Sequence, residues 1–175
     1  MSFEWLRKHG HFPKENADAY EVVKQYSDNL KSNIEAGKGL ILRGPAGTGK
    51  TSIAVSLLKE VIALGKSCMM ISMPNLLDTM LSLSKGDNVA FMNYEQKLRS
   101  IPLLLLDDFG AEYSKSEWVA TKVDSIIIDR YNNMRSIILT TNYSENWTKD
   151  HYSQRIYDRL RGEYAEAIFF GESHR

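Results

Sequence analysis

A glycine-rich stretch with the pattern G-x-x-x-x-G-K-T is the strongest chemical signal in this sequence of 175 residues. It follows a short apolar run and precedes a helical pattern, the context in which such a loop binds phosphates. Its backbone N–H groups can converge on phosphates, and the following helix adds the positive end of its dipole. The stretch consists of Gly44, Pro45, Ala46, Gly47, Thr48, Gly49, Lys50 and Thr51.

Lys50 and Thr51 carry the charge and the hydroxyl that phosphate chemistry needs. We expect the Lys50 ammonium to reach the β- and γ-phosphates of ATP, and the Thr51 hydroxyl to hold Mg²⁺. The alternative is a glycine-rich turn with an incidental lysine, which the flanking strand and helix patterns disfavour. The sequence therefore predicts an ATP site that uses Mg²⁺.

Two adjacent carboxylates, Asp107 and Asp108, follow the continuous apolar run at residues 103–106. Such a run is typical of a strand buried on both faces, and parallel sheets bind ligands at the carboxyl ends of their strands. We expect Asp107 to hold Mg²⁺ and Asp108 to orient or deprotonate the attacking water. The alternative is an acidic turn, which the upstream phosphate loop makes the poorer explanation.

Asn142 closes another strand pattern, residues 137–142, which is apolar at its start and polar at its end. We expect Asn142 to lie near the γ-phosphate and to help place the water. The competing interpretation is that it caps the next turn, as asparagine often does. The neighbouring motifs favour the role at the phosphate.

Arg155 and Arg159 are four residues apart in a helical pattern and therefore share one helix face. Either they form a solvated basic face beside Asp158, or one of them is an arginine finger. Such a finger enters the ATP site of a neighbouring subunit and neutralises charge on the transferring phosphoryl group. The spacing alone leaves both interpretations open.

Short apolar strands alternate with helices along the chain, which predicts a parallel α/β sheet covered on both faces. We expect strands over residues 40–42, 67–72, 103–106, 136–141 and 165–170. We expect helices over residues 19–34, 50–64, 75–83, 89–100, 114–133 and 151–161.

Composition excludes several other classes of protein. The 22 basic residues balance 22 acidic ones, which argues against binding nucleic acid by bulk charge. Cys68 is the single cysteine, so an intrachain disulfide cannot form, and the histidines lack metal-ligand spacing. The sequence contains neither an apolar signal core nor a membrane span, so we expect a cytoplasmic protein.

The order of these motifs resembles the helicase-loader branch of bacterial AAA+ ATPases, which includes the loaders DnaC and DnaI and the transposition ATPase IstB. The resemblance rests on the segments LLLLDDFGAE, IIIDRYNN, SIILTTNY, RIYDRL and GESHR. It extends from about Ala19 to Arg175. We therefore interpret residues 1–18 as an N-terminal arm and residues 19–175 as an AAA+ ATPase domain.

The resemblance implies a three-layer P-loop fold with a five-stranded parallel sheet in the order 5-1-4-3-2 and without a C-terminal helical lid. It implies ATP bound between subunits that assemble into a ring or spiral. It matches Asn142 to the sensor 1 position and favours Arg159 over Arg155 as the arginine finger. It also suggests that residues 74–97 line a path for single-stranded DNA. The basic residues available there are Lys85, Lys97 and Arg99, and the equal alternative is that they form an exposed polar face.

The leading hypothesis is an ATPase that acts on the replicative DNA helicase and single-stranded DNA. The alternatives are an IstB-like ATPase that binds duplex DNA and a transposase, and a nucleotide-switched binding module without appreciable turnover. A small-molecule kinase is disfavoured because an arginine-rich lid segment is lacking. Loaders usually carry a separate N-terminal domain, and about 18 residues precede the first expected helix, so the helicase-binding element is not identified.

Overall fold

Five parallel strands form one sheet in the order β2-β3-β4-β1-β5. The computed structural model describes residues 14–86, 88–111, 117–152 and 154–171. The strands are β1 (Gly39–Arg43), β2 (Cys68–Ser72), β3 (Leu103–Asp107), β4 (Ser136–Thr141) and β5 (Tyr164–Ile168). Read from the other edge, this is the predicted order 5-1-4-3-2, so the expected fold is confirmed.

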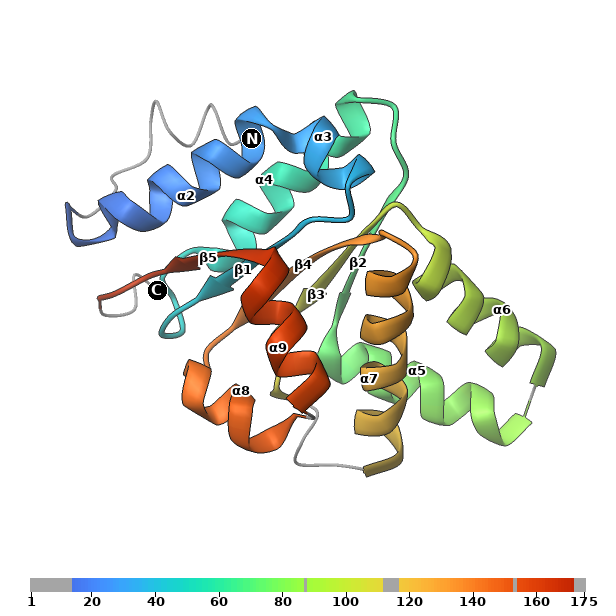
Figure 1. The fold of residues 1–175 in the computed structure, drawn as a ribbon. Coiled ribbons are helices and arrows are strands. Elements are labelled where there is room, and N and C mark those ends of the chain that lie inside the picture. The colour runs from blue at the N-terminus through green and yellow to red at the C-terminus, as the bar shows by residue number, and fades with distance from the viewer. Residues whose placement is uncertain (1–13, 87, 112–116, 153, 172–175) are drawn as a thin grey trace.

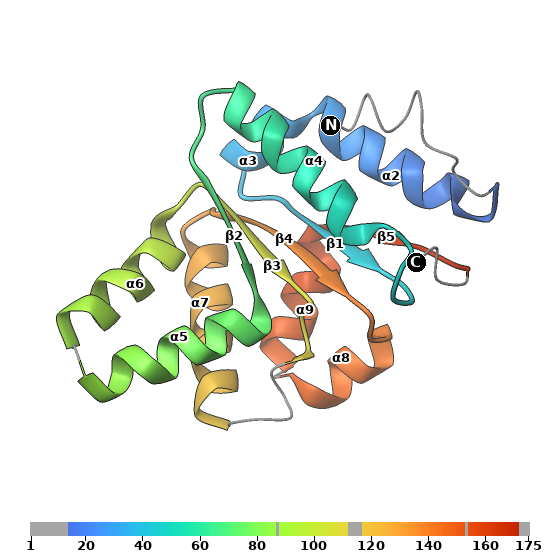
Figure 2. The ribbon, with the colours of Figure 1, turned by 180° about the vertical axis from the view of Figure 1, so that it is seen from behind.

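Helices cover both faces of the sheet and make a three-layer structure (Figure 1). The 3₁₀ helix η1 (Lys14–Asn16) precedes α2 (Ala17–Asp28), α3 (Leu30–Glu35) and α4 (Lys50–Ala63), which share one side. The other side carries α5 (Met73–Gly86), α6 (Asn88–Ser100), α7 (Glu117–Asn132), α8 (Glu145–His151) and α9 (Gln154–Glu163), as Figure 2 shows from behind. In the described part of the chain, no helix is both long and apolar enough to span a bilayer.

The continuous apolar run at residues 103–106 forms strand β3, which is buried on both faces of the sheet. Leu103 and Leu105 belong to the core beneath α2, α3 and α4, whereas Leu104 and Leu106 belong to the core on the opposite face. All four side chains are at most 1% exposed. A strand that alternates between two cores must be apolar at every position.

The helix expected over residues 19–34 is divided in two at Asn29. Asn29 ends α2 with φ −108° and ψ 19°, and its Nδ2 donates to the carbonyl of Gln25 at 3.0 Å. A side-chain amide that binds a carbonyl of the last turn competes with the helical backbone bonds. The apolar face nevertheless continues through the break, since Tyr26 and Leu30 are both buried.

Two helices connect β4 to β5 where the sequence predicted one. The additional helix, α8, begins after Ser144, whose Oγ accepts a hydrogen bond from the N–H of Trp147 at 3.2 Å. A serine at this position is a common helix start, so the signal was present in the sequence. The helix expected over residues 114–133 corresponds to α7, and its predicted first residue, Ser114, lies outside the described residues.

The strand register brings the chemically interesting segments to one edge of the sheet. Arg43 at the end of β1 is paired with Thr141 at the end of β4, and Leu106 of β3 is paired with Leu139. The segments that leave β1, β3 and β4 therefore start side by side. These are the phosphate loop, the acidic pair and Asn142.

Candidate functional site

The phosphate loop connects β1 to α4 through backbone conformations that favour glycine. Gly44 has φ +150°, and a Cβ atom at this position would lie 2.3 Å from the carbonyl oxygen of Phe169. Gly49 has φ +87° and immediately precedes the first residue of α4. A side chain at Gly44 would collide with the backbone of Phe169, and a side chain at Gly49 would be strained by its positive φ although the space around it is open. The loop is thus held with its backbone at the N-terminus of α4.

Lys50 is a buried cation within this loop. It is 5% exposed, and its Nζ donates to the carbonyls of Gly44 and Pro45, each at 2.7 Å. Burial lowers the pKa of Lys50, while the charges of Asp108 and Asp107 act in the opposite direction. The ammonium is therefore placed where the loop and both carboxylates can act on the same ligand.

Asp107, one of the two residues expected at Mg²⁺, lies beside the other, the hydroxyl of Thr51. Its Oδ1 accepts hydrogen bonds from Thr51 Oγ1 at 2.9 Å and from Thr140 Oγ1 at 2.5 Å. Carboxylate and hydroxyl oxygens are suitable neighbours for Mg²⁺, which usually retains several waters in protein sites. The pair Thr51 and Asp107 therefore fits the ion that the loop implies.

Asp108 adopts the left-handed conformation, with φ +56°. A residue other than glycine is strained there by roughly 1–2 kcal/mol. Its N–H donates to Thr140 Oγ1 at 3.0 Å, and the N–H of Phe109 donates to the carbonyl of Thr140 at 2.7 Å. Thr141 Oγ1 donates in turn to the carbonyl of Phe109 at 2.7 Å. Two threonines of β4 thus hold the turn that presents Asp108.

Thr140 was missed as a functional residue by the sequence reasoning. It is 1% exposed and contacts both carboxylate residues, through a side-chain bond to Asp107 and a backbone bond to Asp108. The available signal was the pair of threonines that interrupts the apolar strand before Asn142. A buried hydroxyl in such a strand needs a hydrogen-bond partner, and here the partners are the acidic pair.

A cavity of about 390 Å³ lies between the loop and these strand ends, within the range of ligand sites. Its walls include the predicted Asp108 and Asn142 together with much of the loop. The lining residues are Ala46, Gly47, Gly49, Lys50, Thr51, Ser52, Asp108 and Asn142. Segments separated by about sixty and ninety residues in the chain therefore meet at one polar cavity.

The two candidate arginines lie apart from this cavity. The Arg159 guanidinium sits over the ring of Tyr131, 4.8 Å from its centroid, and its Nη2 is 3.5 Å from Asn132 Oδ1. Within the described residues, Arg159 Nη1 is buried without a hydrogen-bond partner. Arg155 is exposed on the same helix. Neither arginine lines the cavity of its own chain.

The basic residues of the predicted DNA path differ in their surroundings. Arg99 lies 3.6 Å from Glu95 and 3.9 Å from Asp129, and its guanidinium also donates to Ser125. The contacts with Ser125 and Asp129 join α6 to α7. Lys85 and Lys97 are exposed on α5 and α6.

The chain is similar in sequence to proteins named replicative helicase loaders. Replicative helicase loader DnaC of Escherichia coli K12 is 24% identical over 159 residues, which are 90% of this chain and 63% of that protein. Replicative helicase loader DnaI of Bacillus subtilis 168 is 31% identical over 142 residues, 77% of this chain and 44% of that protein. The chain thus spans less than two thirds of the length of these curated relatives.

Two solved structures share the fold. A crystal structure of the DnaC helicase loader matches with a TM-score of 0.76 at 25% identity, covering 94% of this chain and 96% of that one. The replication initiator DnaA bound to AMPPCP and single-stranded DNA matches with a TM-score of 0.77 at 24% identity, covering 97% of this chain and 50% of that one. The model of the family described as IstB-like ATP binding protein matches residues 14–169. The chain therefore belongs to the IstB-like ATP-binding family of AAA+ proteins, with DnaC and DnaI helicase loaders among its relatives.

Proposed function

We propose that the chain hydrolyses ATP with Mg²⁺ and acts in DNA replication as a helicase loader. In this role its ATPase domain, residues 19–175, assembles in an ATP-dependent way on a replicative helicase and single-stranded DNA. The observation that supports catalysis is the cavity at which Lys50, Thr51, Asp108 and Asn142 converge. The loader role is supported by the relatives named replicative helicase loaders.

Each residue around the cavity has a separate role in this mechanism. The loop N–H groups and Lys50 bind the phosphates, and Thr51 with Asp107 holds Mg²⁺. Bound Mg²⁺-ATP supplies the phosphoryl group and the metal charge that offsets its negative oxygens. Asp108 orients or deprotonates the attacking water, and Asn142 helps to hold that water in line.

Completion of the site by a second subunit is part of the proposal. Arg159 is matched to the arginine finger, and its Nη1 already lacks a partner among the described residues. Because Arg159 does not line its own cavity, it would act on the ATP of a neighbouring copy in a ring or spiral. Arg159→Ala should leave the ATP affinity of the monomer unchanged and lower turnover only in assemblies. Arg155→Ala is the matched control from the same helix face.

The test is phosphate release by the purified protein with Mg²⁺-ATP, alone and with single-stranded or duplex DNA. Lys50→Ala serves as the inactive control. Stimulation by single-stranded DNA that vanishes in Lys50→Ala supports the loader role. Binding of ATP without turnover under every condition contradicts it and indicates a nucleotide-switched binding module.

A second function is favoured by the family description, which refers to IstB. An ATPase of that kind would bind duplex DNA and a transposase. Stimulation of turnover by duplex DNA alone would support this function over the loader role. The two candidates share the same ATP site, so the DNA arms of the experiment distinguish them.

A further inference from the structure

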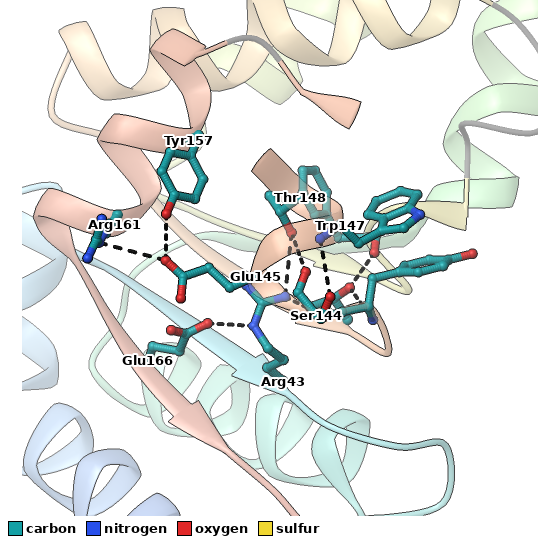
Figure 3. Close-up of polar contacts among 11 residues, drawn as sticks. Arg43, Ser144, Glu145, Trp147, Thr148, Tyr157, Arg161 and Glu166 are labelled. Carbon is teal, nitrogen blue, oxygen red and sulfur yellow. Dashed lines mark hydrogen bonds and ion pairs between the residues drawn. The ribbon is translucent and has the colours of Figure 1, made fainter. Parts of the chain in front are cut away.

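Arg43, the last residue of β1, places a buried guanidinium directly before the phosphate loop (Figure 3). Its side chain is 10% exposed, and its Nε donates to Glu166 Oε1 on β5 at 2.6 Å. Its Nη1 donates to the carbonyl of Tyr143 and, at 3.4 Å, to Thr148 Oγ1 on α8. One side chain therefore joins the strand that carries the phosphate loop to β5 and to the segment after β4.

These contacts hold the chain on both sides of Asn142. On the N-terminal side, the N–H of Gly44 donates to the carbonyl of Thr141 at 3.2 Å. On the C-terminal side, Arg43 binds the carbonyl of Tyr143, whose own N–H donates to Thr141 Oγ1 at 3.2 Å. Both neighbours of Asn142 in the chain are thus bonded to residues at the end of β1, Thr141 to Gly44 and Tyr143 to Arg43.

We propose that Arg43 is a positioning residue that fixes Asn142 at the correct distance from the phosphate loop. This inference rests on the proposed role of Asn142 in placing the attacking water. Arg43 acts through the Tyr143 carbonyl and does not itself line the cavity. Its effect is therefore expected on turnover, and only weakly on ATP affinity.

The chemistry of the anchor requires arginine. A cation buried at the end of an apolar strand is unfavourable unless it is paired and hydrogen-bonded, and Glu166 provides the opposite charge. The planar guanidinium directs separate N–H groups to the carboxylate and to the Tyr143 carbonyl at once. A lysine ammonium carries its donors on one nitrogen and cannot reproduce this fork.

A neighbouring hydrogen bond in the same polar cluster supplies a matched control. Tyr157 OH donates to Glu145 Oε1 at 2.7 Å, and Arg161 Nε lies 3.7 Å from that oxygen. This contact fastens α8 to α9, and Figure 3 shows it beside Arg43. Tyr157→Phe removes one hydrogen bond from the cluster and leaves the bond from Arg43 to Tyr143 in place.

The experiment is a double-mutant cycle on ATP turnover, measured under the DNA condition that gives the fastest wild-type rate. Arg43→Lys should lower kcat by roughly tenfold to a hundredfold, because small misplacements at a reacting centre have effects of that size. ATP affinity should change less than about threefold, since the loop donors remain. In the Asn142→Ala background, Arg43→Lys should cause no further loss, because both changes remove the same interaction.

Several results would overturn the inference. Wild-type kcat in Arg43→Lys contradicts it, as does an equal loss of kcat in Tyr157→Phe. Losses that multiply in the double variant show that Arg43 acts independently of Asn142. Wild-type kcat in Asn142→Ala refutes the proposed role of Asn142 and this inference together, whereas absent turnover in the wild type refutes the proposed function itself.

A second variant tests the same inference in case Arg43→Lys does not fold. Glu166→Gln removes the opposite charge and keeps the Arg43 fork, so its loss of kcat should be smaller and should also vanish in the Asn142→Ala background. Thermal unfolding of each variant identifies any loss of folded protein. A Glu166→Gln loss that persists unchanged in the Asn142→Ala background contradicts the positioning role.

Discussion

Lys50 and Arg130 are two buried cations that bind backbone carbonyls, yet their surroundings differ. Arg130 on α7 is 0% exposed, and burial lowers its pKa to about 10. Its Nη1 and Nη2 each donate to two carbonyls, which belong to Leu98, Arg99, Pro102 and Ser136. Lys50 also binds two carbonyls, but it forms part of a cavity wall beside Asp108.

The difference shows what distinguishes a binding site from a structural clamp. Arg130 sits at the end of the sheet where β4 begins, with donors directed at α6, at the turn before β3 and at β4 itself. Lys50 sits at the opposite end, where two carboxylates and a left-handed residue, Asp108, also meet. Burial and carbonyl contacts are common to both cations. The polar cavity and the strained carboxylate occur beside Lys50.

The largest expected effect is on nucleotide binding in Lys50→Ala. Removing the ammonium deletes charged hydrogen bonds to phosphate, worth about 1.5–3 kcal/mol each. Two such bonds correspond to a loss of ATP affinity of roughly 10²–10⁴-fold, measured by titration calorimetry. Thermal unfolding should change little, because the variant loses two hydrogen bonds to loop carbonyls and is also relieved of the cost of burying a charge. Wild-type ATP affinity in this variant would refute the assignment of the loop.

Asp108 should affect turnover and leave binding intact. Asp108→Asn retains a residue that tolerates the left-handed conformation but removes the base. We expect kcat to fall by roughly 10²–10⁴-fold with ATP affinity nearly unchanged. Asp108→Gly is the companion variant, since relief of strain should raise the free energy of unfolding by about 1 kcal/mol. Normal turnover in both variants would remove Asp108 from the mechanism.

Arg130→Met tests whether Arg130 stabilises the fold without contributing to ATP binding. The change leaves several buried carbonyls without donors, each at a cost of about 1–3 kcal/mol before the structure relaxes. We expect a net loss of about 3 kcal/mol, which corresponds to a decrease in Tm of roughly 6–12 °C for a domain of this size. At temperatures where the variant is folded, its ATP affinity should match the wild type. A selective loss of ATP affinity with unchanged Tm would reverse the assignment of the two cations.

Local patterns predicted the parts of the molecule that local chemistry determines. The apolar run of β3, the loop before α4 and the polar ends of β3 and β4 are each visible in short stretches of sequence. The sheet order came from the resemblance to known proteins. It was confirmed by the strand pairing, and the DnaC helicase loader structure shares the fold.

The individual side-chain bonds between strands that are distant in the sequence were not predictable in this way. The bond from Arg43 to Glu166 spans 123 positions, and the bond from Thr140 to Asp107 spans 33. No periodicity or motif in a single sequence indicates that either pair of residues is in contact. The separate helix α8 was missed for a different reason, because seven residues are too few for a clear apolar pattern.

The smallest expected effect concerns Thr140, whose hydroxyl joins the two carboxylate residues. Thr140→Val preserves the shape of the side chain but leaves the N–H of Asp108 without its acceptor and Asp107 with one donor fewer. We expect kcat to fall by about tenfold and the Mg²⁺ concentration for half-maximal turnover to rise, because Asp107 loses part of its orientation. Thr140→Ser keeps the hydroxyl and should remain within about twofold of the wild type on both measures. If the serine and valine variants behave alike, the hydroxyl does not position the acidic pair, and the difference between the two ends of the sheet rests on Lys50 and Asp108 alone.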